Sequence, residues 1–280
     1  MSLPVVRFAK KADKEQVMKF VTNTWSWGDY IPEVWDAWLI DKTGRMFVVE
    51  VDGKVVGMNH IRFLDEGVGW LEGVRIHPEY RRMGLATLLG ETAMNYARTR
   101  GIRRFRLLSS VTNLAAHRQV RRMNFRKVAV FNSFEVTDRE GRDGSSIASE
   151  TGDIEDAEES LLNSEEFRRG KGFFFDSWTM RSFSECGIRK VLRNNSLMKV
   201  KDEAGSAFVL YGRSRSAERF DQVNFVWGDG KLLKKLLSQL AIDAKDLQTL
   251  LPKSGKLTRS MIAAGFKKVG EMILYERLEV

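Results

Sequence analysis

The stretch at residues 70–89 reads WLEGVRIHPEYRRMGLATLL, and the interpretation of the whole chain starts from it. Its pattern predicts a strand over residues 70–76, a basic turn over residues 77–84 and a helix from Leu85 towards Arg98. A strand that enters a helix through a short glycine-containing loop directs several free backbone N–H groups at one point. The helix dipole favours an anion at the same point, so we expect this loop to bind a phosphate group.

The side chains of the loop agree with that expectation. Gly84 allows the backbone to approach a phosphate closely, Ala86 keeps the start of the helix uncluttered, and Arg81 and Arg82 add positive charge. The loop is neither a dinucleotide-binding loop nor a P-loop, because neither G-x-G-x-x-G nor G-x-x-x-x-G-K-[ST] is present. The plainer alternative is an ordinary strand–turn–helix with a solvated arginine pair.

The order Ile-x-Pro-x-x-Arg-x-x-Gly-x-Ala resembles motif A of the GCN5-related N-acetyltransferases, the GNAT family, with Arg81, Gly84 and Ala86 at the matching positions. The resemblance implies that acetyl-CoA is the co-substrate, with its pyrophosphate in the loop and its pantetheine arm along the preceding strand. The residues that it implies for this role are Val74, Arg75, Ile76, Arg81, Arg82, Met83, Gly84, Leu85, Ala86, Thr87 and Asn113.

Composition limits the other possibilities. A chain of 280 residues suits two compact domains better than one. The single cysteine, Cys186, excludes an intrachain disulfide and a cysteine-rich zinc site, so we expect a cytoplasmic protein. Three scattered histidines indicate no metal site, no apolar run reaches the length of a membrane span, and the start Met-Ser-Leu-Pro does not resemble a signal peptide. The formal net charge of +9 alone is weak evidence, and we expect no nucleic-acid or membrane partner.

The order of predicted elements over residues 1–140 is a strand, two helices, three antiparallel strands, the phosphate loop with its helix, and then strand, helix, strand. This is the order of the GNAT family. The fold class that we expect is α/β (α+β), with a mixed, mostly antiparallel sheet flanked by helices.

A second segment resembles the family signature N-x-x-A-x-x-x-Y-x-x-x-G-F, with Asn113, Ala116 and Phe125 at matching positions. Two positions depart from it. Asn124 replaces Gly and suits a helix end, because Asn tolerates the left-handed conformation. Val120 stands where many members have the Tyr that protonates the leaving thiolate, and Val cannot replace a phenol.

Residues 141–165 are rich in Gly, Ser and acidic side chains, and we interpret them as a linker that ends in a short acidic helix. Residues 166–280 look like a degenerate second GNAT-like domain, because residues 246–266 align without gaps on residues 105–125 at an offset of 141. The second copy has no counterpart of the phosphate loop. Chance similarity between two strand–helix–strand units is the alternative.

Acyl transfer to an amine needs a base for the ammonium and a proton donor for the thiolate. Glu72 lies on the strand before the loop, where similar acetyltransferases often carry a carboxylate. It shares a strand face with Trp70 and Val74, where its pKa could be raised, or it could bind the acceptor ammonium. His60 is the second catalytic candidate, and His117 could replace the missing phenol. An exposed carboxylate and packed histidines are the structural alternatives.

The acceptor site is expected around the aromatic segment that holds Trp25, Asp29 and Tyr30, together with Glu72. This segment, the pattern at Trp35 and the long second half are similar to the histidine N-acetyltransferase branch of the family. That resemblance implies a small amino acid or amine as acceptor, with Asp29 or Glu72 holding its ammonium.

The sequence therefore predicts an acetyl-CoA-dependent N-acetyltransferase that acts by direct attack of a primary amine, without a metal or a covalent enzyme intermediate. A protein N-terminal or lysine acetyltransferase is the alternative enzyme. A non-catalytic acyl-CoA sensor or scaffold is the alternative from another class, and Val120 is its main support. A monomer is slightly favoured over a homodimer, because a tandem pair can imitate a dimer within one chain.

Overall fold

The computed structural model describes residues 2–21, 28–136, 150–151, 153–203, 205–213, 221–243 and 246–279. The chain forms two compact units. The first unit comprises Met1–Ser109, Asn113–Lys127 and Tyr275–Val280, and the second comprises Ser110–Thr112 and Val128–Leu274. Among the described residues no helix has the length and the apolar character needed to cross a membrane.

The first unit is a mixed sheet with helices on both faces. Strands β1 to β4 are antiparallel neighbours, β5 lies parallel to β4, and the end of β14 follows β5. Its elements are β1 (Val5–Phe8), α1 (Lys14–Val21), α2 (Ile31–Ile40), β2 (Gly44–Val51), β3 (Lys54–Leu64), β4 (Val68–Ile76), α3 (Leu85–Arg98), β5 (Arg104–Ser110), α4 (Leu114–Arg122) and the start of β6 (Arg126–Glu135), with short 3-10 helices at Lys11–Asp13 and Pro78–Tyr80.

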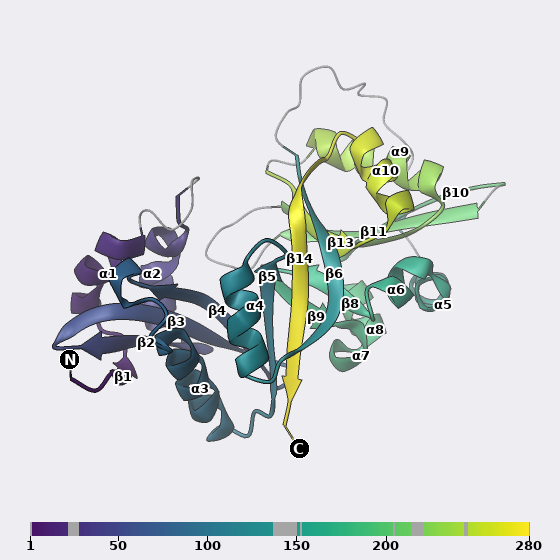
Figure 1. The fold of residues 1–280 in the computed structure, drawn as a ribbon. Coiled ribbons are helices and arrows are strands. Elements are labelled where there is room, and N and C mark those ends of the chain that lie inside the picture. Colours follow the sequence, from purple (N-terminus) through teal and green to yellow (C-terminus); the bar gives the residue numbers. More distant parts are fainter. Residues whose placement is uncertain are drawn as a thin grey trace. The chain divides into compact units, whose positions relative to one another are not determined.

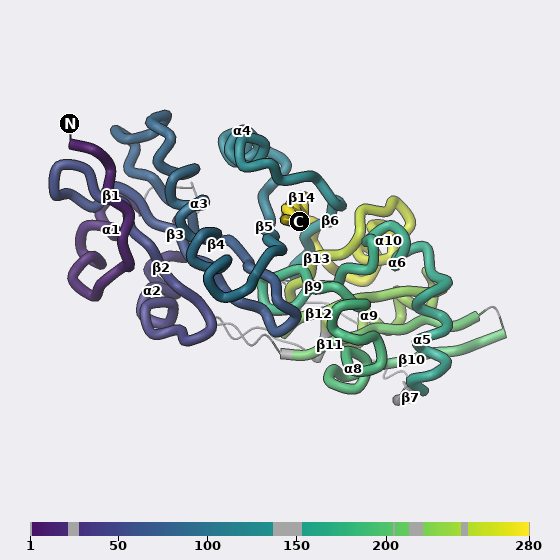
Figure 2. Tube along the Cα trace, turned by 90° about the horizontal axis from the view of Figure 1, so that it is seen from below, coloured from purple at the N-terminus to yellow at the C-terminus, as the bar shows by residue number. Residues whose placement is uncertain are grey.

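Apolar side chains at helical spacing fix the helices of the first unit on its sheet. Helix α1 buries Val17, Phe20 and Val21 together with Trp35 of α2 and Met58 of β3 in one core cluster. Helix α3 packs on the opposite face of the same strands (Figures 1 and 2). Mixed sheets covered on both faces are typical of alternating strand and helix patterns, and the expected fold class is confirmed.

The second unit has the same kind of sheet, in the order β14, β6, β13, β12, β11, β10, β7 (Figure 1). Its pairs are antiparallel where β7, β10, β11 and β12 meet, and β12 lies parallel to β13. Its elements are β7 (Glu150–Thr151), α5 (Ile154–Asn163), α6 (Glu165–Arg169), β8 (Phe173–Asp176), β9 (Thr179–Ser182), α7 (Phe183–Cys186), α8 (Ile188–Asn194), β10 (Ser196–Asp202), β11 (Gly205–Arg213), β12 (Asp221–Gly228), α9 (Gly230–Asp243), β13 (Gln248–Pro252), α10 (Gly255–Ala263) and β14 (Lys267–Leu278).

From β10 onward, the second half of the chain repeats the element order that the first half has from β2 to β6, apart from the short 3-10 helix at Pro78–Tyr80. Helices α4 and α10 have equal length, start 141 positions apart, and are capped by the side chains of Asn113 and Ser254. Strands β6 and β14 start at the same offset. The connection between β12 and α9 is reduced to Asp229, whose carboxylate accepts hydrogen bonds from the backbone amides of Lys231 and Leu232. In the second unit the carboxylate of Asp229 therefore binds the first backbone amides of α9. In the first unit the longer loop between β4 and α3 places no such carboxylate at the start of α3.

The last strand of each repeat contributes to the other unit. Strand β6, the last strand of the first repeat, pairs with β13 in the second unit. Residues 275–280, at the end of the second repeat, lie in the first unit. The expected domains at residues 1–140 and 166–280 are continuous segments of the sequence. The two units are defined by contacts between residues, and each of them includes more than one segment. The expected linker at residues 141–165 lies outside the described residues over 141–149, and its expected acidic helix corresponds to α5.

Candidate active site

The loop between β4 and α3 bends through two left-handed residues. Arg82 has a φ of 66° and Gly84 a φ of 78°. Such alternation of backbone conformation turns successive N–H groups towards one point and forms a concave anion site. A Cβ atom added to Gly84 would meet no atom within 4 Å, so the corner is open.

The backbone amides of this corner are available. Within the part of the chain that the structure describes, no protein acceptor lies within hydrogen-bonding distance of the amides of Arg82, Met83, Gly84, Leu85, Ala86 and Thr87. The first amide of α3 with an acceptor is that of Leu88, which donates to the carbonyl of Gly84 at 3.0 Å. Unpaired amides at a helix start, beside two exposed arginines, suit a diphosphate.

Strands β4 and β5 separate beyond the first residues of their pairing. The last pair between them is Trp70 and Arg106, although β4 continues to Ile76 and β5 to Ser110. Among the described residues, the edge of β4 beyond Trp70 therefore has no strand partner on this side. An unpaired strand edge next to an anion site is suited to an extended ligand with amide groups.

A bulge in β4 redirects the side chains that follow Glu72. His60 pairs with Glu72 and Met58 pairs with Arg75, so two residues of β4 lie opposite Asn59 alone. Strict alternation would place Glu72 and Arg75 on opposite faces, and the bulge places them on the same face. The expected common face of Trp70, Glu72 and Val74 is therefore interrupted after Glu72, because the sequence pattern does not include the extra residue.

Glu72 lies in a network of charged groups. Its Oε1 atom is 2.9 Å from Nδ1 of His60, and its Oε2 atom accepts a hydrogen bond from Arg62 at 3.0 Å. Burial raises the pKa of Glu72, but the charge of Arg62 and the hydrogen bond and charge of His60 outweigh it and lower that pKa to about 2. The raised pKa that the sequence suggested is wrong, because the arginine comes from the neighbouring strand.

His60 is buried between Glu72 and the end of α2. Its ring stacks on Trp38, with 4.4 Å between centroids and 10° between planes. Its Nε2 atom is buried without a hydrogen-bond partner and lies 3.8 Å from Oδ2 of Asp41. The structure thus brings two expected catalytic residues, Glu72 and His60, into direct contact.

Asp29, Tyr30 and Arg75 form a second cluster on the same face. Two nitrogens of Arg75 donate to the two carboxylate oxygens of Asp29 at 2.6 and 3.0 Å, and the guanidinium lies 5.1 Å from the ring centroid of Tyr30. Burial raises the pKa of Tyr30 to about 12, although Arg75 opposes this shift. The Arg75 side chain therefore binds Asp29, while its expected contact with the cofactor stays a prediction. Trp25 lies outside the described residues.

Helix α4 holds the remaining expected residues. Oδ1 of Asn113 accepts the amide of Ala116 at 3.1 Å and so caps the helix, and Asn124 takes the expected left-handed conformation with a φ of 57°. His117 lies with Nδ1 2.9 Å from the hydroxyl of Tyr275, a residue of β14. The Val120 side chain is buried.

Sequence reasoning missed Arg62, Trp38, Asp41 and Tyr275, because each reaches the site through strand pairing or helix packing between distant segments. The one local signal was Gly73, a glycine inside a strand, which is a frequent sign of a bulge. Among the described side chains, no three His, Cys, Asp or Glu residues converge on a point where they could hold a metal ion.

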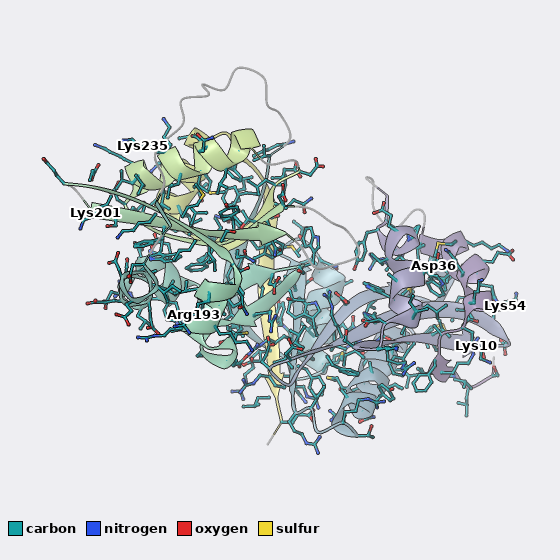
Figure 3. The ribbon with its side chains drawn as sticks, turned by 180° about the vertical axis from the view of Figure 1, so that it is seen from behind. Lys10, Asp36, Lys54, Arg193, Lys201 and Lys235 are labelled. Carbon is teal, nitrogen blue, oxygen red and sulfur yellow. The ribbon has the colours of Figure 1, made fainter. Side chains whose placement is uncertain are left out.

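The excess positive charge is spread over both units. Figure 3 shows exposed basic side chains on separate elements, at Lys10 and Lys54 in the first unit and at Arg193, Lys201 and Lys235 in the second. Isolated charges of this kind interact weakly with one another across water.

Comparison with known proteins finds similarities in the first part of the chain. Residues 14–125 match the model of the acetyltransferase (GNAT) family. A histidine N-acetyltransferase of Oreochromis niloticus is 28% identical over 82 residues, which is 29% of this chain and 24% of that protein. The match thus spans about a quarter of that curated relative.

Several solved structures resemble nearly the whole chain. A proposed acetyltransferase from Thermoplasma acidophilum gives a TM-score of 0.61 at 18% identity and covers 98% of this chain and 100% of that one. A GCN5-related N-acetyltransferase from Sphaerobacter thermophilus gives a TM-score of 0.61 at 14% identity, over 98% of this chain and 95% of that one. At such identities the likeness concerns the fold, and it extends over both repeats.

Proposed function

We propose that the protein transfers an acetyl group from acetyl-CoA to the primary amine of a small acceptor, and the match of residues 14–125 to the model of the acetyltransferase (GNAT) family supports this proposal. The reaction proceeds by direct attack of the amine on the thioester. An amino acid is the favoured acceptor class, and the partial likeness to a histidine N-acetyltransferase supports it.

The observation that carries the proposal is the set of unpaired amides from Arg82 to Thr87 around an open Gly84. These amides and the two exposed arginines hold the diphosphate of acetyl-CoA. The unpaired edge of β4 receives the amide groups of the pantetheine arm. Acetyl-CoA supplies the activated acetyl group, and the main chain of this unit holds it beside Glu72.

Glu72 and Asp29 supply negative charge for the acceptor ammonium. Both carboxylates are largely buried, and both face the side of the sheet that α2 covers. The rings of Trp38 and Tyr30, which contact His60 and Arg75 respectively, form an edge-to-face pair with 6.0 Å between their centroids, and this pair gives the acceptor an apolar wall. A charged amine that loses water in such a site is bound tightly only when a carboxylate pairs with it.

The departing thiolate needs a proton, and we assign this step to the pair of His117 and Tyr275. Val120 carries no proton donor, and His117 lies one helical turn from it. The Tyr275 hydroxyl at 2.9 Å from His117 supplies the phenol that α4 lacks.

A panel of amines tests the proposal. We expect transfer of acetyl from acetyl-CoA to at least one free amino acid or small amine, measured as released thiol and as acetylated product by mass spectrometry. Transfer to a lysine peptide or a peptide N-terminus alone would favour the protein acetyltransferase. Tight binding of acetyl-CoA without any transfer would favour the sensor.

Gly84→Trp tests the phosphate loop directly. The indole fills the open corner, so we expect acetyl-CoA binding to weaken by at least about 100-fold in calorimetry, while the fold is retained because no protein atom lies near the new Cβ. Gly101→Trp is the matched control, because Gly101 has a φ of 79° and equally open surroundings at the other end of α3. Equal affinity for acetyl-CoA in both variants would show that the loop is not the cofactor site.

A further inference from the structure

A cavity in the second unit is lined mainly by basic side chains. It has a volume of about 740 Å³ and lies between α6, the turn after it and the start of α10. Cavities of this size hold small organic ligands. Four basic side chains and one carboxylate line it, namely Arg168, Arg169, Lys171, Lys253 and Glu165. All five belong to the second unit, so the cavity is complete within it.

Carboxylates neutralise only part of this positive charge. Glu165 pairs with Arg169 at 2.5 Å. Lys253 pairs with Glu271 at 2.7 Å, and the same carboxylate pairs with Lys268 at 2.6 Å, so it is shared between two lysines. The cavity therefore keeps an excess of positive charge after its ion pairs are formed.

Arg168 and Lys171 carry most of this excess. In the part of the chain that the structure describes, no carboxylate lies within 4.0 Å of the side-chain nitrogens of either residue. Both side chains are exposed to solvent at the cavity. A cleft lined by charge of one sign raises the local concentration of ions of the opposite sign, so this cavity attracts anions.

The backbone holds Lys171 in a conformation that lysine rarely adopts. Its φ is 54°, in the left-handed region, where glycine or asparagine is usual at a helix end. Its amide donates to the carbonyl of Arg168 at 3.2 Å. A Cβ atom at Gly170 would lie 2.8 Å from Cγ of Pro252, so the turn packs closely against the end of β13. A lysine fixed at a position that favours glycine indicates a use for its charge.

The cavity is separate from the counterpart of the phosphate loop. In the second unit that counterpart is the connection between β12 and α9, where the carboxylate of Asp229 binds the first amides of the helix. Arg168 and Lys171 belong to α6 and the turn after it, which precede β10 and so lie outside the repeated order of elements. Their charge is therefore not what remains of a second cofactor loop.

We propose that this cavity binds a small phosphorylated anion that carries two or more negative charges. The planar guanidinium of Arg168 binds two phosphate oxygens, and the ammonium of Lys171 adds a point charge beside it. A singly charged carboxylate would leave one of these two cations unmatched. The inference goes beyond the proposed function, because it concerns the second unit and does not depend on acetyl transfer.

Inorganic pyrophosphate is the probe, and glycine signals report where it binds. Protein labelled with nitrogen-15 glycine gives NMR signals for Gly255, which lines the cavity, and for Gly84 in the phosphate loop. Gly84→Trp and Gly255→Ala assign these signals. The nearest atom to the new Cβ of Gly255→Ala is a guanidinium nitrogen of Arg259 at 3.7 Å, so the substitution fits. Because Gly84→Trp also fills the phosphate loop, it isolates binding in the second unit.

The double variant Arg168→Gln with Lys171→Gly removes both unmatched charges. Glycine adopts the left-handed conformation without strain, so the turn after α6 is retained. The double variant Arg193→Gln with Lys235→Gln is the control. It removes the same amount of charge from exposed positions on α8 and α9 of the same unit (Figure 3).

We expect pyrophosphate to shift the Gly255 signal in wild type, in Gly84→Trp and in the control variant. The affinity read from this signal should fall at least about fivefold in Arg168→Gln with Lys171→Gly. It should also fall as sodium chloride is added, because salt screens exposed charges. An unmoved Gly255 signal overturns the proposal, as does equal affinity in the cavity variant and the control. A shift of Gly255 without one of Gly84 supports the cavity and counts against the phosphate loop of the proposed function.

Two further titrations identify the source of the phosphate. Tighter binding of ADP than of pyrophosphate at the Gly255 signal assigns the cavity to a nucleotide, and the reverse order assigns it to a free diphosphate. Citrate carries several negative charges without phosphorus. Binding of citrate as tight as that of either phosphate compound overturns the assignment to a phosphorylated ligand.

Discussion

Glu72 is kept ionised by its neighbours on the adjacent strand. The sequence identifies it as a candidate because it precedes the phosphate loop, but it gives no indication of Arg62, which reaches it only after β3 and β4 pair. The same holds for His60, whose partners Trp38 and Asp41 come from α2 and the turn after it. The type of each residue can be read from the sequence, whereas the charge state of Glu72 depends on an arginine ten positions away that reaches it only through strand pairing.

The lowered pKa of Glu72 has a consequence for stability. A carboxyl group whose pKa falls from 4.5 to about 2 on folding stabilises the folded state above pH 4.5, and this contribution is lost as the pH falls towards 2. It amounts to about 3 kcal/mol at neutral pH. We expect Glu72→Gln to lower the free energy of unfolding of the first unit by about that amount at pH 7. The difference from wild type should shrink between pH 4.5 and 2.

Urea unfolding at a series of pH values measures this difference. Glu33→Gln is the control, since Glu33 is an exposed carboxylate of α2 in the same unit. A difference between wild type and Glu72→Gln that stays constant down to pH 2 would contradict the assignment of charge.

Elements of the first unit follow the sequence closely where the signal is local. The strand, loop and helix around residues 70–89 appear as expected, and the Asp52–Gly53 turn joins β2 to β3 with positive φ at both residues. The bulge in β4 was not predicted. The sequence pattern assumes that side chains alternate between the two faces of a strand, and it gives no sign of an extra residue that breaks this alternation. Gly73 is its only trace, and the close packing of Trp38 explains why a glycine is needed there.

Gly73→Ala tests this account of the bulge. The new Cβ would lie 2.5 Å from the ring of Trp38 at a φ of 69°, so we expect a loss of about 2–4 kcal/mol in the free energy of unfolding. Gly67→Ala has a similar φ of 75° with no atom within 4 Å of the new Cβ, and should cost only about 1 kcal/mol. Equal losses in the two variants would mean that Trp38 moves aside without cost.

The whole molecule depends on its final strand. Residues 275–279 lie in the first unit, where Glu276 pairs with buried Arg106 at 2.7 Å and Arg277 binds both Glu91 and the carbonyl of Met123. The repeat itself was predictable from the offset of 141, since it preserves α4, α10 and the strands after them without gaps. The contribution of β14 to the first unit was not predictable, because three-dimensional packing determines which strands pair.

Glu276→Gln tests the role of this strand. The variant removes a charged partner of the Arg106 guanidinium, which is 1% exposed. We expect the free energy of unfolding to fall by about 2 kcal/mol. This is less than the ~3–5 kcal/mol typical of a fully buried pair, because Glu276 is 27% exposed. Glu271→Gln on the same strand removes pairs with the partly exposed Lys253 and Lys268 and should cost less than about 1 kcal/mol. Hydrogen exchange of β5 and α4 measures the effect, and equal protection in both variants would contradict it.

The position of β14 makes the two repeats dependent on one another during synthesis. The ribosome synthesises this strand after every other described element. The first unit therefore lacks the strand next to β5 until the second repeat has been synthesised. A nascent chain released before β14 would carry the entire phosphate loop and still lack Tyr275 and Glu276. Loss of the second repeat would therefore also remove the residues of β14 that belong to the first unit.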